Sequence, residues 1–180
     1  MSHARLKVGA ALLVALTAAA QTPSNVAAPR CSSAEYRQFD FWLGEWDVTQ
    51  GDKTAGHNSI RSILNGCAIS EEWSGTRGFK GNSLNFYNAD TKRWHQTWID
   101  SQGQSLALSG QFEAGSMTLQ SAPVDTFPRH RITWTPTPDK SVRQLWQVQD
   151  APGADWKTLF DGRYSAVRHL HRAARDEPRR

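Results

Sequence analysis

The sequence predicts an all-β protein that folds as a single antiparallel up-and-down β-barrel of about ten strands, preceded by one short helical turn. Two observations support this fold class. Short segments in which apolar and polar residues alternate recur along the chain, and glycine, proline, asparagine and aspartate mark turns between them. Consecutive hairpins that close on themselves leave no exposed sheet edge, which favours a barrel over an open sheet.

The helical turn is predicted at residues 33–38, with Ser32 or Ser33 as its N-cap. No helical periodicity runs long enough to indicate a second architecture. The predicted strands are 45–50, 57–65, 67–74, 82–87, 94–100, 104–110, 116–121, 131–136, 142–149 and 156–164.

The chain divides into four parts by composition. Residues 1–20 combine a short basic start, an apolar run and small residues, which is the pattern of a secretory signal peptide. Residues 21–30 form a leader that we expect to be disordered, 31–167 form the barrel domain, and 168–180 form a basic tail. The apolar run is shorter than the roughly 20 residues that a spanning helix needs. We therefore expect a secreted or periplasmic protein with no membrane span after cleavage; an uncleaved anchor is the alternative.

The net charge of +4 comes from the two ends of the chain. The signal segment and the arginine-rich tail carry the excess of basic residues, whereas residues 21–167 are nearly balanced. A nucleic-acid platform carries its basic patch on the folded face. No nucleic-acid partner is therefore expected.

The chain has two cysteines, Cys31 and Cys67. Two thiols that reach an oxidising compartment commonly form a disulfide. Such a bond stabilises a fold by roughly 3–4 kcal/mol in the chain-entropy account. We expect the pair to be bonded; two free, buried thiols are the alternative.

Two predicted strands carry tryptophan and glutamine on the same face: Gln96 with Trp98, and Gln144 with Trp146. A packed core favours leucine, isoleucine and valine, whereas ligand cavities combine apolar walls with a few polar groups. We therefore expect an internal cavity; a solvent-facing row or structurally satisfied polar groups are the alternatives. The predicted ligand-binding residues are Glu71, Asn85, Tyr87, Gln96, Trp98, Arg131, Gln144 and Trp146.

The segment Gly44-x-Trp46 opens the first predicted strand and resembles the Gly-x-Trp signature of lipocalin and other calycin barrels. The longer string at 39–48, Phe-Asp-Phe-Trp-Leu-Gly-Glu-Trp-Asp-Val, resembles the signature of exported bacterial lipocalin-like proteins classed as a domain of unknown function. The resemblance covers most of 31–167 and implies a barrel with a pocket. It also implies that Trp46 closes one end against a late-strand arginine, Arg163 or Arg168. It supplies no catalytic residues.

Several functions are compatible with these features. The first is an exported protein that binds a small apolar or amphipathic molecule inside the barrel. The second is an enzyme that uses an inward Glu71 as acid or base, with Tyr87 or Arg131 stabilising charge; pairing of Glu71 with Arg131 is the structural alternative. A filled barrel with an interaction role is the third. The six histidines lack metal-site spacing, so we expect no metal and no cofactor, although His169 or His171 would be the residue to hold haem.

Overall fold

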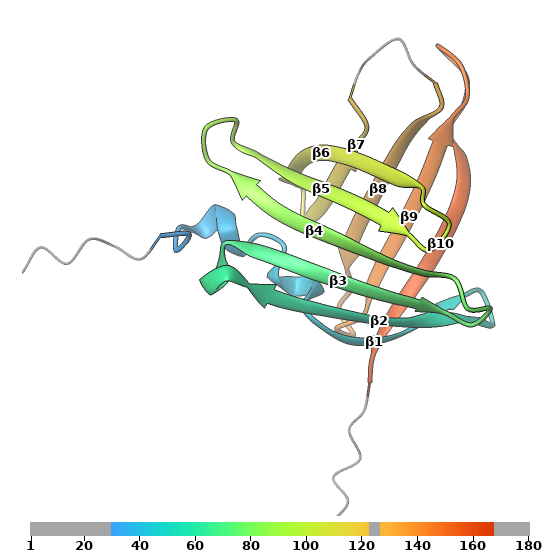
Figure 1. Cartoon of the computed structure of the whole chain (residues 1–180), viewed down its shortest axis with the longest axis horizontal. Coiled ribbons are helices and arrows are strands. Elements are labelled where there is room, and N and C mark those ends of the chain that lie inside the picture. The colour runs from blue at the N-terminus through green and yellow to red at the C-terminus, as the bar shows by residue number, and fades with distance from the viewer. Residues whose placement is uncertain (1–29, 123–126, 168–180) are drawn as a thin grey trace, which may run out of the picture.

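A computed structural model describes residues 30–122 and 127–167, and its strands form one closed barrel (Figure 1). Each strand pairs antiparallel with its sequence neighbours, and the last strand pairs with the first. The predicted all-β, ten-stranded, up-and-down barrel is therefore confirmed. The strands are β1 (Gly44–Gln50), β2 (Lys53–Ile63), β3 (Ala68–Gly75), β4 (Lys80–Asn88), β5 (Arg93–Asp100), β6 (Ser105–Glu113), β7 (Ser116–Gln120), β8 (Arg129–Pro136), β9 (Val142–Gln149) and β10 (Lys157–Ala166).

The strand positions agree closely with the prediction, and β9 matches it at both ends. The largest difference is β2, which begins at Lys53 instead of residue 57. The stretch before His57 carries little apolar alternation and includes Gly56, so it gave no strand signal. Gly56 belongs there because a Cβ at this position would lie 2.4 Å from the backbone oxygen of Ser74 on β3. The close approach of β2 and β3 at Gly56 explains why β2 is longer than predicted. The sequence pattern gives no sign of this approach.

The segment before β1 forms two short 3-10 helices, η1 (Ala34–Arg37) and η2 (Asp40–Trp42), and a third, η3 (Leu64–Gly66), joins β2 to β3. The predicted helical turn is thus confirmed, and Ser33 occupies its N-cap position, as predicted. The Ser33 hydroxyl donates to the carboxylate of Glu35 at 2.5 Å and not to a backbone amide.

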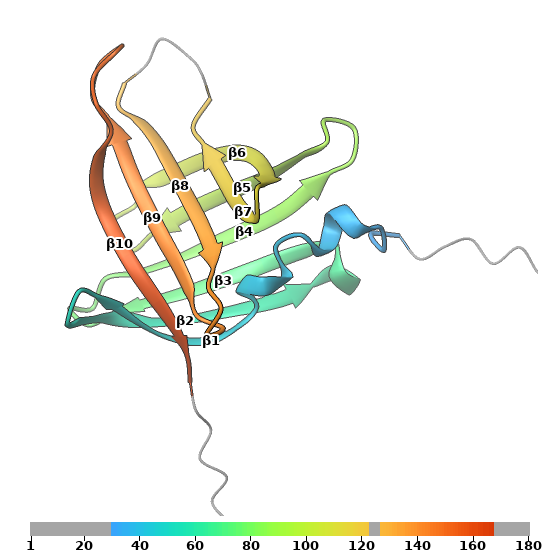
Figure 2. The same cartoon turned by 180° about the vertical axis from the view of Figure 1, so that it is seen from behind.

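The N-terminal segment closes one end of the barrel (Figure 2). Phe39 and Trp42 are both 0 % exposed, and their rings stack with centroids 4.9 Å apart. Phe39 also meets the rings of Trp94 and Trp134 edge-on. These four rings fill the lumen between β5, β8 and η2, so the apolar core of the molecule sits at this end.

The predicted disulfide between Cys31 and Cys67 is present. It ties the start of the N-terminal segment to the residue that precedes β3. Arg37 reinforces the same attachment by donating to the backbone oxygen of Gly66. The segment that closes the barrel is therefore anchored covalently to its rim.

Trp46 lies buried at the closed end, as predicted, but Arg163, one of its two predicted partners, does not contact it. The indole nitrogen of Trp46 donates to the backbone oxygen of Trp42 at 2.9 Å, and the ring meets Tyr164 edge-on. Arg163 is exposed and pairs with Asp139, because alternation along β10 turns the neighbours of Tyr164 outward.

Gly44 allows Trp46 to take this position. Its backbone has a φ of +146°, which favours glycine, and a Cβ there would lie 3.3 Å from the Trp46 ring. Arg168, the other predicted partner of Trp46, lies outside the described residues, as do the signal segment, residues 21–29 of the leader and the basic tail. No helix within 30–122 and 127–167 has the length and apolarity to cross a membrane.

Candidate functional site

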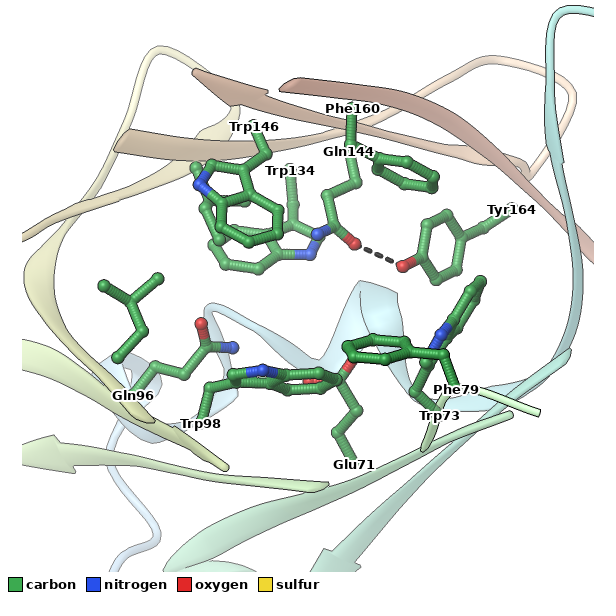
Figure 3. Close-up of a pocket in the computed structure, with 12 residues that line it drawn as sticks. Glu71, Trp73, Phe79, Gln96, Trp98, Trp134, Gln144, Trp146, Phe160 and Tyr164 are labelled. Atoms are coloured by element: carbon green, nitrogen blue, oxygen red, sulfur yellow. Dashed lines mark hydrogen bonds between the residues drawn. The ribbon is translucent and has the colours of Figure 1, made fainter. Parts of the chain in front are cut away.

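A cavity of about 200 Å³ lies inside the barrel, toward the end opposite the N-terminal segment. Its rim consists of half-buried side chains near the β3–β4 and β5–β6 turns and on β9 and β10, whereas its floor is buried. Figure 3 shows these side chains converging on the lumen from both sides of the barrel. The lining residues are Glu71, Trp73, Phe79, Gln96, Trp98, Leu106, Ile132, Trp134, Gln144, Trp146, Phe160 and Tyr164.

Three inward-facing glycines keep the aromatic rings of the rim against the barrel wall. A Cβ at Gly81 would lie 2.1 Å from the ring of Trp98, and one at Gly162 would lie 2.2 Å from the ring of Phe160. Gly56 has the same relation to Trp73, at 2.8 Å. Since each ring occupies the space that a side chain on the wall would take, the rings lie flat and the lumen between them stays open.

The floor of the cavity carries one carboxyl group, that of Glu71 on β3. The side chain is 5 % exposed. Its Oε1 accepts a hydrogen bond from the Asn58 amide at 2.8 Å, and its Oε2 accepts one from the Ser83 hydroxyl at 2.5 Å. The three residues come from adjacent strands β2, β3 and β4, where the register places their side chains on the same inner face.

A chain of amide groups extends this network toward β5. The side-chain nitrogen of Gln96 donates to Asn85 Oδ1 at 2.9 Å and to Ser83 Oγ at 3.4 Å. The side-chain nitrogen of Asn85 also donates to Ser83 Oγ, at 2.9 Å. Because the Ser83 oxygen accepts both bonds, its own proton is left to donate to Glu71.

A second branch leads from Glu71 to β9 and β10. Asn58 also donates to the hydroxyl of Tyr164, and that hydroxyl donates to Gln144 Oε1 (Figure 3). Burial, together with the nearby carboxyl of Glu71, raises the pKa of Tyr164 well above its ordinary value. Tyr164 therefore keeps its proton at neutral pH and acts as the donor to Gln144.

Burial raises the pKa of Glu71, while the hydrogen bonds from Ser83 and Asn58 act in the opposite direction. None of the residues that line the cavity is an arginine, a lysine or a histidine. The pairing of Glu71 with Arg131, which the sequence left open, is wrong. Arg131 lies on the outer face of β8, where it donates to Gln147 and stacks over the ring of Trp156.

The structure brings five of the predicted ligand-binding residues to the cavity and separates the others. Asn85 does not line the cavity; it is fully buried and bonded to Ser83 and Gln96 in the polar network. Tyr87 was predicted to bind the ligand but does not line the cavity. Its ring packs against Tyr36 and Trp94 near the closed end. The constellation of Glu71 with Tyr87 or Arg131 is therefore not assembled. The five residues that line the cavity are Glu71, Gln96, Trp98, Gln144 and Trp146.

Sequence reasoning missed two polar residues of this site, Asn58 and Tyr164. Asn58 shares the inward face of β2 with Gly56 and Ile60. The stretch around it contains few apolar residues, so the sequence pattern did not show which face points inward. Tyr164 gave no binding signal of its own, and its bond to Gln144 depends on the register between β9 and β10.

One rim residue has a further anchor. The indole nitrogen of Trp146 donates to Nδ1 of His130 at 3.0 Å, and burial lowers the pKa of that histidine. His130 is therefore held in the neutral form that accepts this bond, which fixes the Trp146 ring at the mouth of the cavity.

The fold and the site together define a closed antiparallel β-barrel with one end blocked and an internal cavity whose floor is polar. No protein-family model matches the chain, and no curated protein matches it either. Within 30–122 and 127–167, no group of three histidine, cysteine, aspartate or glutamate residues is placed to hold a metal ion.

Proposed function

We propose that the protein is an exported binding protein that holds a small, partly apolar molecule inside the barrel. The observation that carries this proposal is the cavity of about 200 Å³ whose rim is aromatic and whose floor is polar. Ligand sites in proteins share this combination of apolar walls with a few placed polar groups. The rings give a ligand apolar contact, and the amides of Gln96 and Gln144 give it orientation (Figure 3).

The arrangement of the rim supports a cavity that serves binding. A barrel that needed only a packed core would fill its lumen at both ends, because unfilled space forgoes dispersion contacts and costs stability. Here Phe39 and Trp42 fill the closed end, whereas Gly81 and Gly162 hold rings away from the centre of the other end. Binding would recover the contacts that the open lumen forgoes.

Export is the second part of the proposal. The signal-type pattern of 1–20 and the disulfide between Cys31 and Cys67 support it, because such bonds persist in oxidising compartments. Membership in the exported lipocalin-like family with the 39–48 signature is likewise proposed, with the up-and-down barrel and the buried Trp46 as its support. The histidines considered for haem, His169 and His171, lie outside the described residues.

Binding is tested by titration with N-phenyl-1-naphthylamine, an uncharged dye that fluoresces in apolar surroundings. Burying a few hundred Å² of apolar dye surface at about 25 cal/mol per Å² predicts a dissociation constant roughly between 1 µM and 1 mM. We expect saturable binding with one site per chain and quenching of tryptophan fluorescence by the dye.

A matched pair of variants shows where the dye binds. Leu106 lines the cavity, whereas Leu84 is 43 % exposed on the outside of β4. Leu106→Trp should fill the lumen and weaken dye binding by about tenfold or more, which is 1.4 kcal/mol. Leu84→Trp adds the same indole outside and should leave binding unchanged. Absence of binding to the unaltered protein, or equal effects of the two variants, would overturn the proposal.

A further inference from the structure

The cavity contains a buried acid for which the described residues provide hydrogen bonds but no positive charge. Glu71 accepts bonds from Asn58 and Ser83, and it takes part in none of the ion pairs that the described residues form. Burying a carboxylate without a cation costs several kcal/mol. A buried, unbalanced acid that faces open volume therefore calls for an explanation.

The hydrogen bonds around Glu71 are arranged for a carboxylate. The Ser83 proton is committed to Oε2, because the Ser83 oxygen already accepts from Asn85 and Gln96. Asn58 turns its nitrogen toward Oε1, and its own Oδ1 is then left as a buried acceptor with no hydrogen-bond partner within the described residues. The network thus places donors on both oxygens of Glu71 and leaves a buried acceptor unsatisfied to do so.

The walls above Glu71 favour a positive charge. Seven of the lining residues are aromatic, and the faces of such rings attract cations. The rings of Trp98 and Phe79 line the same cavity as the Glu71 side chain (Figure 3). The carboxamides of Gln96 and Gln144 add oxygen atoms that accept hydrogen bonds, and no lining side chain carries a positive charge.

We infer that the ligand is a small organic cation, an ammonium compound with an aromatic or aliphatic body, and that Glu71 is its counter-ion. This inference rests on the proposed binding function and specifies its ligand class. The apolar body lies among the half-buried rings of the rim, and the ammonium group lies at the floor near the carboxylate. A cation beside Glu71 favours the ionised carboxylate and so opposes the rise in pKa that burial causes, whereas a neutral ligand does not, and the carboxylate would repel an anion.

The test compares three probes that share one body and differ in head group: 2-phenylethylamine, 2-phenylethanol and 3-phenylpropionate. Each competes with N-phenyl-1-naphthylamine at pH 7.5, where the amine is a cation and the acid an anion. The amine should bind at least about tenfold more tightly than the alcohol, and the anion should bind most weakly. This comparison uses the unaltered protein, so it does not depend on how any variant folds.

Two variants identify the group responsible. Glu71→Gln keeps the shape of the side chain and removes its charge. The affinity of this variant for the amine should therefore lie within about threefold of its affinity for the alcohol. Glu72→Gln makes the same change at the next residue of β3, which points outward, and should leave the preference intact.

The outcomes separate the two proposals. If the dye binds but the three probes compete equally, or the alcohol or anion competes best, the cation inference is wrong and the binding function stands. A preference for the amine that survives Glu71→Gln would refute the role of Glu71. If the dye does not bind at all, the binding function fails and the inference fails with it.

Discussion

Removal of the Trp46 side chain tests how the closed end of the barrel is held together. Trp46 is 4 % exposed; its indole nitrogen donates to the backbone oxygen of Trp42, and its ring meets that of Tyr164. Trp46→Ala removes the ring and leaves a cavity, which costs about 3–5 kcal/mol for a buried aromatic residue. A domain of this size is stable by about 5–15 kcal/mol, so the loss is a large share of the total.

Two further variants divide this cost. Trp46→Phe keeps most of the ring but leaves the Trp42 oxygen without its donor, so it should cost about 1–3 kcal/mol. Arg163→Ala removes an exposed pair with Asp139 and should cost less than about 1 kcal/mol. If Arg163 packed on Trp46, as the sequence resemblance implied, the alanine variant would cost much more.

Urea denaturation followed by far-ultraviolet circular dichroism measures these differences in unfolding free energy. Equal slopes of free energy against urea concentration would show that the variants have comparable denatured states. The predicted order of destabilisation is Trp46→Ala, then Trp46→Phe, then Arg163→Ala. A cost below about 1 kcal/mol for Trp46→Ala would refute the account of the closed end.

Three other perturbations have defined outcomes. Because burial raises the pKa of Glu71, its contribution to stability is present below its ordinary value of 4.5 and is lost as the pH rises through the folded value. The stability of Glu71→Gln relative to the unaltered protein, measured by urea midpoints, should therefore be greater at pH 8 than at pH 4.5. A difference in stability that does not change with pH would contradict the burial of this acid. Replacing both Cys31 and Cys67 by serine should cost about 3–4 kcal/mol in the same assay, since their bond closes a loop with a sequence separation of 36; a near-zero cost would show that the bond does not anchor the segment. Gly81→Ala should push the Trp98 ring into the lumen and weaken dye binding, whereas unchanged binding would show that the ring has another place to go.

The fold was predictable because its signals are local. Alternation and turn residues mark each strand, and an up-and-down barrel needs only that neighbours in sequence pair in space. The same alternation correctly grouped Gln96 with Trp98 and Gln144 with Trp146 on inward faces. These pairs each lie within one strand, where the period of two is sufficient.

The parts that could not be predicted depend on contacts between distant segments. Arg131 points outward because Ile132 and Trp134 take the inward positions of β8, an alternation that the prediction overlooked. Tyr87 packs against Tyr36 of the N-terminal segment, a contact that has no local signal. The bond of Asn58 to Glu71 follows from the pairing of β2 with β3, and the flat position of Trp98 depends on Gly81 on another strand. A resemblance to a signature suggested an arginine beside Trp46, but the residue that alternation turns inward on β10 is Tyr164.

The most direct test of the account is a crystal structure of the protein grown with N-phenyl-1-naphthylamine. We expect electron density for the dye inside the barrel, between the rings of Trp98 and Trp146 and above the buried Glu71. Dye bound only to the outer surface, or a lumen filled by the rotated rings of Trp98 and Phe160 with no dye inside, would contradict this expectation.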